Sequence, residues 1–125
     1  ERLVSSDELD RDAHRDVRIY QRLHPEDPRP TLMLAHDFSE RSSWTEAVER
    51  YELALRRWPE ARYDARMADD LIEALTRDED GAAELLVATF GAEMVPVLEL
   101  RLAESEHRPT RQALRRALDL ALAAD

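Results

Sequence analysis

The apolar positions of this chain recur at helical spacing through most of its length. Leu34 and Phe38 are four residues apart, and Ala47, Tyr51 and Ala54 follow one another at intervals of four and three. Such spacing places each set on one face of an α-helix. The small Ala side chains on the second face allow two helices to approach closely. The pattern therefore predicts a tight antiparallel helix pair.

Local signals mark the ends of the second helix of this pair. Ser43 and Glu46 stand at the positions of a capping box, in which each side chain accepts a backbone N–H at the start of a helix. Pro59 ends the helix, because the residue before a proline is pushed out of the helical region. Residues 30–59 are therefore expected to form one helix-turn-helix unit.

The landmarks of this unit resemble those of a tetratricopeptide (TPR) repeat, W-x2-L-G-x2-Y…A-x3-F…P. Thr31 stands where Trp would, Ala35 replaces Gly, and Phe38 and Tyr51 exchange aromatic types. The resemblance implies an all-α fold of antiparallel helix pairs stacked in a short right-handed superhelix. It also implies a protein-binding scaffold, because such repeats commonly serve as binding surfaces.

The same landmarks recur weakly upstream. A shift of about 34 residues places the following residues under Ala47, Tyr51, Ala54 and Pro59: Ala13, Val17, Tyr20 and Pro25. Residues 1–25 are therefore expected to hold the second helix of a partial repeat, over residues 8–23. Because its first helix is missing, the chain is expected to be a piece of a longer protein.

Downstream, the size pattern survives better than the residue types. The same shift places Gly81, Leu85 and Ala88 under Ala47, Tyr51 and Ala54. Residues 60–125 are therefore expected to form degenerate repeat helices, and the phrase 90–99 is similar to HEAT-like helical repeats. Pro96 is tolerated only in a first turn, so its helix should begin near Ala92 or Glu93. The expected helices span 62–77, 81–90, 93–104 and 109–124.

Composition agrees with a single all-α domain. The chain has 125 residues with only two Gly, and it contains no Cys, so disulfides and thiolate metal sites are excluded. Its apolar runs are far shorter than the roughly 18 residues that a membrane helix needs. All basic residues are Arg and Asn is absent, a bias typical of GC-rich bacterial genes. We expect a soluble, cytoplasmic bacterial protein of six or seven helices.

Charge and motifs argue against nucleic-acid binding and catalysis. The formal net charge of −10 disfavours contact with a phosphate backbone. No two of the four His are three or four residues apart, and no H-E-x-x-H, nucleotide loop or EF-hand loop is present. The sequence therefore predicts a protein that is not an enzyme, with no metal site and no cofactor.

The resemblance places a partner-binding groove on the first helices of successive repeats. Family members that bind chaperone C-termini hold the terminal carboxylate with Lys and Asn, and this chain has neither residue. A hydrophobic segment or an amphipathic helix is therefore the expected ligand. The residues implied at the groove are Leu32, Met33, His36 and Ser39 from one helix and Tyr63, Arg66, Met67 and Asp70 from the next.

Two alternatives remain open on sequence grounds. Leu32, Met33 and Met67 could instead be core residues, in which case the chain is a structural spacer or a dimerisation segment without a groove ligand. The C-terminal helix carries Leu on more than one side, so an extra apolar face should seek a neighbour. That neighbour is either another copy or a following repeat, and we expect a homodimer at high concentration that becomes a monomer when Leu118 and Leu122 are changed to Glu.

Overall fold

The protein is all-helical over residues 6–124, the part of the chain that this computed structural model describes, with side chains described from residue 14 onward. No strand occurs within that range. The elements in chain order are α1 (Ser6–Leu23), α2 (Arg29–Glu40), α3 (Trp44–Arg57), the 3-10 turn η1 (Pro59–Tyr63), α4 (Met67–Thr76), α5 (Ala82–Phe90), the 3-10 turn η2 (Gly91–Met94), α6 (Val95–Glu104) and α7 (Arg108–Ala123).

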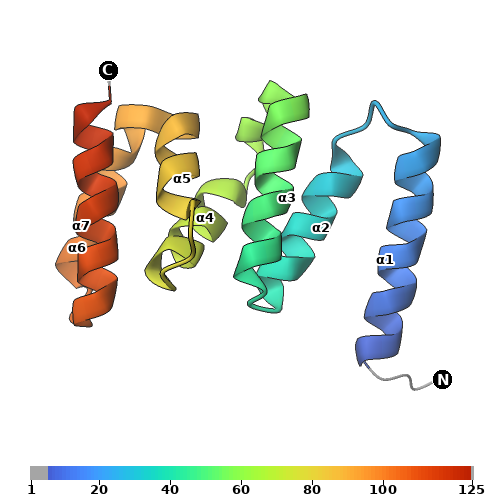
Figure 1. The fold of residues 1–125 in the computed structure, drawn as a ribbon, viewed down its shortest axis with the longest axis horizontal. Coiled ribbons are helices and arrows are strands. Elements are labelled where there is room, and N and C mark those ends of the chain that lie inside the picture. The colour runs from blue at the N-terminus through green and yellow to red at the C-terminus, as the bar shows by residue number, and fades with distance from the viewer. Residues whose placement is uncertain (1–5, 125) are drawn as a thin grey trace.

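The helices follow one another along the long axis of the molecule (Figure 1). In this view α3, α5 and α7 stand in front, and α2, α4 and α6 lie behind them. Contacts join α2 to α3, α4 to α5 and α6 to α7, and α1 packs on α2. The connections within the first and third pairs are only three residues long, 41–43 and 105–107. Short connections of this kind force consecutive helices to pack side by side as antiparallel hairpins.

One apolar core runs from α2 to α7. Leu34, Ala35, Tyr51 and Ala54 are buried where α2 meets α3, as the sequence spacing predicts. The Trp58 indole N–H donates to the Glu26 carbonyl oxygen over 3.1 Å, so the end of α3 is fastened to the α1–α2 connection. The remaining large side chains that are completely buried are Met67, Leu71, Ile72, Leu86, Leu98 and Leu114.

The start of α3 differs from the expected capping box. Ser43 is the residue before the helix, as predicted, but its side chain makes no capping hydrogen bond. The backbone angles of Ser43 are φ −87° and ψ 73°. An N-cap side chain usually reaches the helix from the extended region of backbone angles. The turn at 41–43 instead holds Ser43 through its own N–H, which donates to the Phe38 carbonyl oxygen over 2.8 Å.

The helix expected over 62–77 begins later, at Met67. Asp64 has φ −58° and ψ 131°, and its carboxylate accepts the Arg66 backbone N–H over 3.1 Å. An Asp side chain that accepts a backbone N–H two residues ahead offers the chain a turn in place of a helix. The 3-10 turn η1 and this Asp turn together occupy the segment that the periodicity had extended into α4.

The buried positions of α5 differ from those that the repeat spacing predicts. The predicted counterparts of Ala47, Tyr51 and Ala54 were Gly81, Leu85 and Ala88, but Gly81 and Ala88 are exposed and Leu85 is only half-buried. Because α5 begins only at Ala82, a fixed repeat length places its first landmark, Gly81, before the helix. The buried residues at the start and middle of α5 are Ala82, Ala83 and Leu86.

Two further expectations concern α6 and α1. Pro96 lies in the first turn of α6, as predicted, and the residues proposed for the helix start form η2 just before it. Of the landmarks predicted on the first helix, Val17 is half-buried and Tyr20 is exposed. The side chain of Ala13 lies outside the described residues.

Candidate interaction surface

The residues predicted for the groove do not form one uniform surface. Met33 on α2 and Tyr63 on η1 are exposed, with 56% and 79% of their surfaces accessible. Leu32 is half-buried against the core, while Met67 and Asp70 are buried. The structure therefore divides the set into exposed apolar residues and residues that pack inside. Ser39 is buried, and His36 and Arg66 are half-buried members of a polar network.

Tyr51 and Asp70 form the buried part of that network. The Tyr51 hydroxyl donates to Asp70 Oδ2 over 2.5 Å, which joins α3 to α4 inside the core. Burial, followed by the hydrogen bond to the Asp70 carboxylate, raises the pKa of Tyr51 well above its ordinary range. Tyr51 therefore stays protonated in the folded protein, because its anion would form beside a carboxylate in the interior.

The half-buried part of the network joins α2 to the turn before α4. His36 Nε2 lies 2.8 Å from Asp64 Oδ2, and the His36 ring is tilted against Tyr51 at 6.1 Å between centroids. Arg66 Nη1 donates to Glu40 Oε1 over 2.6 Å, and Arg66 Nη2 lies 3.7 Å from Asp70. The hydrogen bond to Glu40 raises the pKa of Arg66.

These contacts define the role of the network. Each side chain in it already has a partner within the protein, and the contacts cross from α2 and α3 to α4. A half-buried His–Asp pair resembles part of a catalytic triad in composition, but triad catalysis also requires a nucleophile within hydrogen-bond reach of the His. Among the described residues, the His36 imidazole forms a hydrogen bond or ion pair only with Asp64. The geometry is that of a structural clamp between helices.

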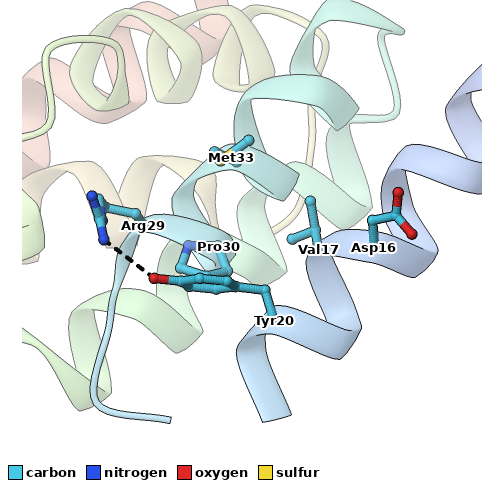
Figure 2. Close-up of a pocket in the computed structure, with 6 residues that line it drawn as sticks. All are labelled: Asp16, Val17, Tyr20, Arg29, Pro30 and Met33. Atoms are coloured by element: carbon cyan, nitrogen blue, oxygen red, sulfur yellow. Dashed lines mark hydrogen bonds between the residues drawn. The ribbon is translucent and has the colours of Figure 1, made fainter. Parts of the chain in front are cut away.

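An apolar hollow lies between α1 and α2 (Figure 2). Its volume is about 410 Å³, and Val17, Tyr20, Pro30 and Met33 supply its apolar lining. A space of this size accepts one or two large side chains of a partner, although it is open rather than enclosed. Of the predicted groove residues only Met33 lines this hollow. Asp16 and Arg29 complete its rim.

Hydrogen bonds hold one rim of the hollow in place. The Arg29 guanidinium donates to Asp27 over 2.6 Å and to the Tyr20 hydroxyl over 3.3 Å, the contact drawn in Figure 2. The side-chain hydrogen bond from Arg29 keeps the pKa of the Asp27 carboxyl far below its ordinary range. Tyr20 also stacks on His24 with 4.2 Å between ring centroids. The Tyr20 ring is thus positioned before any partner arrives.

Sequence reasoning missed the contribution of α1 to this surface. Val17 and Tyr20 were matched to the buried landmarks Tyr51 and Ala54 of the next unit, which predicted core positions. Their spacing of three residues does show that they share a helix face. Only the placement of α1 beside α2 reveals that this face borders an open hollow.

Comparisons with known proteins leave the family open, because no family model, no curated protein and no solved structure matches this chain. Among the described residues no helix has the length and apolarity needed to cross a membrane. The same part of the chain holds no group of three or more His, Cys, Asp or Glu side chains arranged to bind a metal ion. The surface features above are therefore the basis for a functional proposal.

Proposed function

We propose that the protein is a TPR-like interaction scaffold within a larger cytoplasmic bacterial protein, and that it is not an enzyme. The observation that carries this proposal is the apolar hollow between α1 and α2, which reaches the exposed Met33. The paired helices and the small residues buried between α2 and α3 also fit a repeat of this class. The ligand is a peptide or helix that inserts an apolar side chain into the hollow.

An unbiased peptide selection tests the scaffold. Peptides displayed from a random library should be enriched on the intact chain, and replacing Met33 by Asp should weaken the enriched peptides about tenfold or more, because a central apolar contact is lost. The matched control is Leu53→Asp, since Leu53 is also an exposed apolar residue but lies on α3, away from the hollow. Anisotropy titrations measure both variants.

Two outcomes of the selection would contradict the scaffold. If no peptide is enriched, the chain is better described as a spacer. If Met33→Asp and Leu53→Asp weaken binding equally, the hollow is not the binding site.

The second candidate, a dimerisation segment, is favoured by the exposed Leu120 and Leu122 on α7. The expected contact through Leu118 is wrong, because Leu118 is buried in the core. Leu122, which exposes 61% of its surface, remains as the apolar contact through which a second copy could pack.

Sedimentation over a wide range of protein concentration tests the second candidate. The intact chain should self-associate at high concentration, and Leu122→Glu should shift the association to higher concentration because a charge would be buried at the contact. Leu23→Glu, at an exposed apolar position on α1, is the control and should leave association unchanged. A strict monomer throughout would remove this candidate.

A further inference from the structure

Charge is distributed unequally between the two layers of helices. The layer formed by residues 29–40, 59–77 and 91–104 carries ten Asp and Glu against five Arg. The opposite layer, formed by α3, α5 and α7, carries five Asp and Glu against seven Arg. Much of the negative charge of the protein is therefore gathered in the layer of α2, α4 and α6. We call the exposed side of this layer, which includes Met33, Asp69, Val97, Leu100 and Glu104, the even-helix face.

Ion pairs show that the even-helix face is continuous across successive elements. Glu40 on α2 pairs with Arg66 at 2.6 Å, and Glu73 on α4 pairs with Arg101 on α6 at 2.8 Å. A longer contact of 3.8 Å joins Arg62 of η1 to Glu93 of η2. The Glu73–Arg101 pair brings the polar sides of α4 and α6 together, and the Glu40–Arg66 pair joins α2 to the residue before α4. Three of the five Arg of the layer therefore already have acidic partners within it.

Two carboxylates of the face have no direct hydrogen-bond or ion-pair partner among the described residues. Within the described part of the chain, neither Asp69 on α4 nor Glu104 on α6 forms a hydrogen bond or ion pair through its side chain, and both are exposed. An exposed carboxylate is stable in water by itself, so neither group needs an ion-pair partner within the protein. They are free to interact with a cation brought by a partner.

Exposed apolar side chains lie among these charges. Val97, Leu100 and Glu104 follow one another at intervals of three and four, so they share one side of α6. Leu100 exposes 62% of its surface and Val97 38%. On α2 the exposed Met33 lies seven residues before Glu40, which places both on one stripe. The even-helix face therefore combines apolar residues with an excess of negative charge.

We infer that the even-helix face binds a positively charged amphipathic helix. This inference rests on the proposed scaffold function and adds a second contact surface, on α4 and α6, to the hollow between α1 and α2. Apolar side chains of the partner contact Leu100 and Val97, and its flanking Lys or Arg side chains approach Asp69 and Glu104. An acidic partner is disfavoured, because like charges placed opposite one another across an interface are repelled.

Three synthetic peptides test the charge class of the partner against the full chain. The first is an amphipathic helix of Leu and Lys, the second replaces each Lys by Glu, and the third scrambles the first so that it has no apolar face. The Leu–Lys helix should bind at least about tenfold more tightly than either of the others in low salt. Its affinity should fall as the salt concentration rises, because exposed charges are screened.

Substitutions then locate the site. The double variant Asp69→Asn with Glu104→Gln should weaken the Leu–Lys helix about three- to tenfold and reduce its salt dependence. The matched control neutralises two exposed carboxylates of the opposite layer, Glu46→Gln with Glu49→Gln on α3, and should leave affinity within about twofold.

A second pair of variants tests the apolar contact. Leu100→Ser should weaken the Leu–Lys helix about tenfold, because an exposed apolar anchor is removed from the centre of the contact. Leu53→Ser, at the exposed apolar position on α3, should not weaken it. Urea midpoints confirm that each variant is folded.

The outcomes separate this inference from the scaffold proposal. Equal weakening by the two charge pairs, or equal binding of the scrambled peptide, would show non-specific attraction to an acidic protein and overturn the inference. Tighter binding of the Leu–Glu helix, with loss in Leu100→Ser, would overturn the charge assignment while leaving the scaffold in place. If none of the peptides binds and the random library also yields nothing, both proposals fail.

Discussion

Replacing Leu118 by Glu is expected to unfold the protein at neutral pH. Leu118 exposes only 4% of its surface and belongs to the apolar core that α7 shares with the rest of the array. Burying an unpaired carboxylate costs several kcal/mol even when the group partly neutralises itself. A domain of this size is stabilised by only about 5–15 kcal/mol. The far-ultraviolet circular dichroism and the urea midpoint of the variant measure the effect.

Leu122→Glu is the matched control for this prediction. Leu122 lies one helical turn further on but exposes 61% of its surface, so its replacement should change the free energy of unfolding by about 0.5 kcal/mol or less. Lowering the pH should restore part of the stability of Leu118→Glu, because burial raises the pKa of a carboxyl and the protonated form is less costly to bury. A wild-type urea midpoint for Leu118→Glu would show that α7 does not pack in the core as described.

Tyr51→Phe is expected to lower the free energy of unfolding by about 1–3 kcal/mol, because a buried carboxylate loses a hydrogen-bond donor. Asp70 is 8% exposed, and without the hydroxyl of Tyr51 its carboxylate keeps only the longer contact to Arg66 at 3.7 Å. Tyr63→Phe is the control, since Tyr63 is largely exposed. An unchanged urea midpoint for Tyr51→Phe would show that the hydrogen bond contributes nothing to stability.

The same pair predicts a pH dependence with a definite sign. The pKa of Tyr51 is raised in the folded protein, whereas a tyrosine in the unfolded chain loses its proton near pH 10, at about its ordinary pKa. The contribution of Tyr51 is therefore fully present below about pH 10 and is lost as the pH rises above it. The stability difference between wild type and Tyr51→Phe should shrink over that range. Urea midpoints measured from about pH 8 to about pH 11 would reveal the trend.

The helices themselves could be predicted from the sequence, because their signals are local. The spacing of Leu34, Ala47, Tyr51 and Ala54 predicts the faces that the structure buries, and Pro96 predicts the start of α6 to within one turn. These signals depend on residues three or four apart, so no distant partner is needed to read them. The all-helical class follows from the same patterns and from the scarcity of Gly.

The connections were less predictable, because their conformation depends on single side-chain contacts. The carboxylate of Asp64 accepts a backbone N–H in the turn before α4, and this turn moves the register of the next helix pair. A fixed repeat length assumes that every connection has the same length. Where one turn takes extra residues, the core positions predicted for α5 fall on residues that are exposed or half-buried, such as Gly81 and Leu85.

Only the tertiary structure decided which surface residues are available to a partner. Met33, Met67, Leu118 and Leu122 are all apolar residues on helices, yet Met67 and Leu118 are buried while Met33 and Leu122 are exposed. Helical periodicity assigns residues to a face, but it does not state whether that face meets another helix or solvent. That outcome depends on how α1, α2, α4 and α7 pack, which involves residues far apart in the chain. The sequence by itself determined the helices and their apolar faces, and long-range packing decided which of those faces were covered.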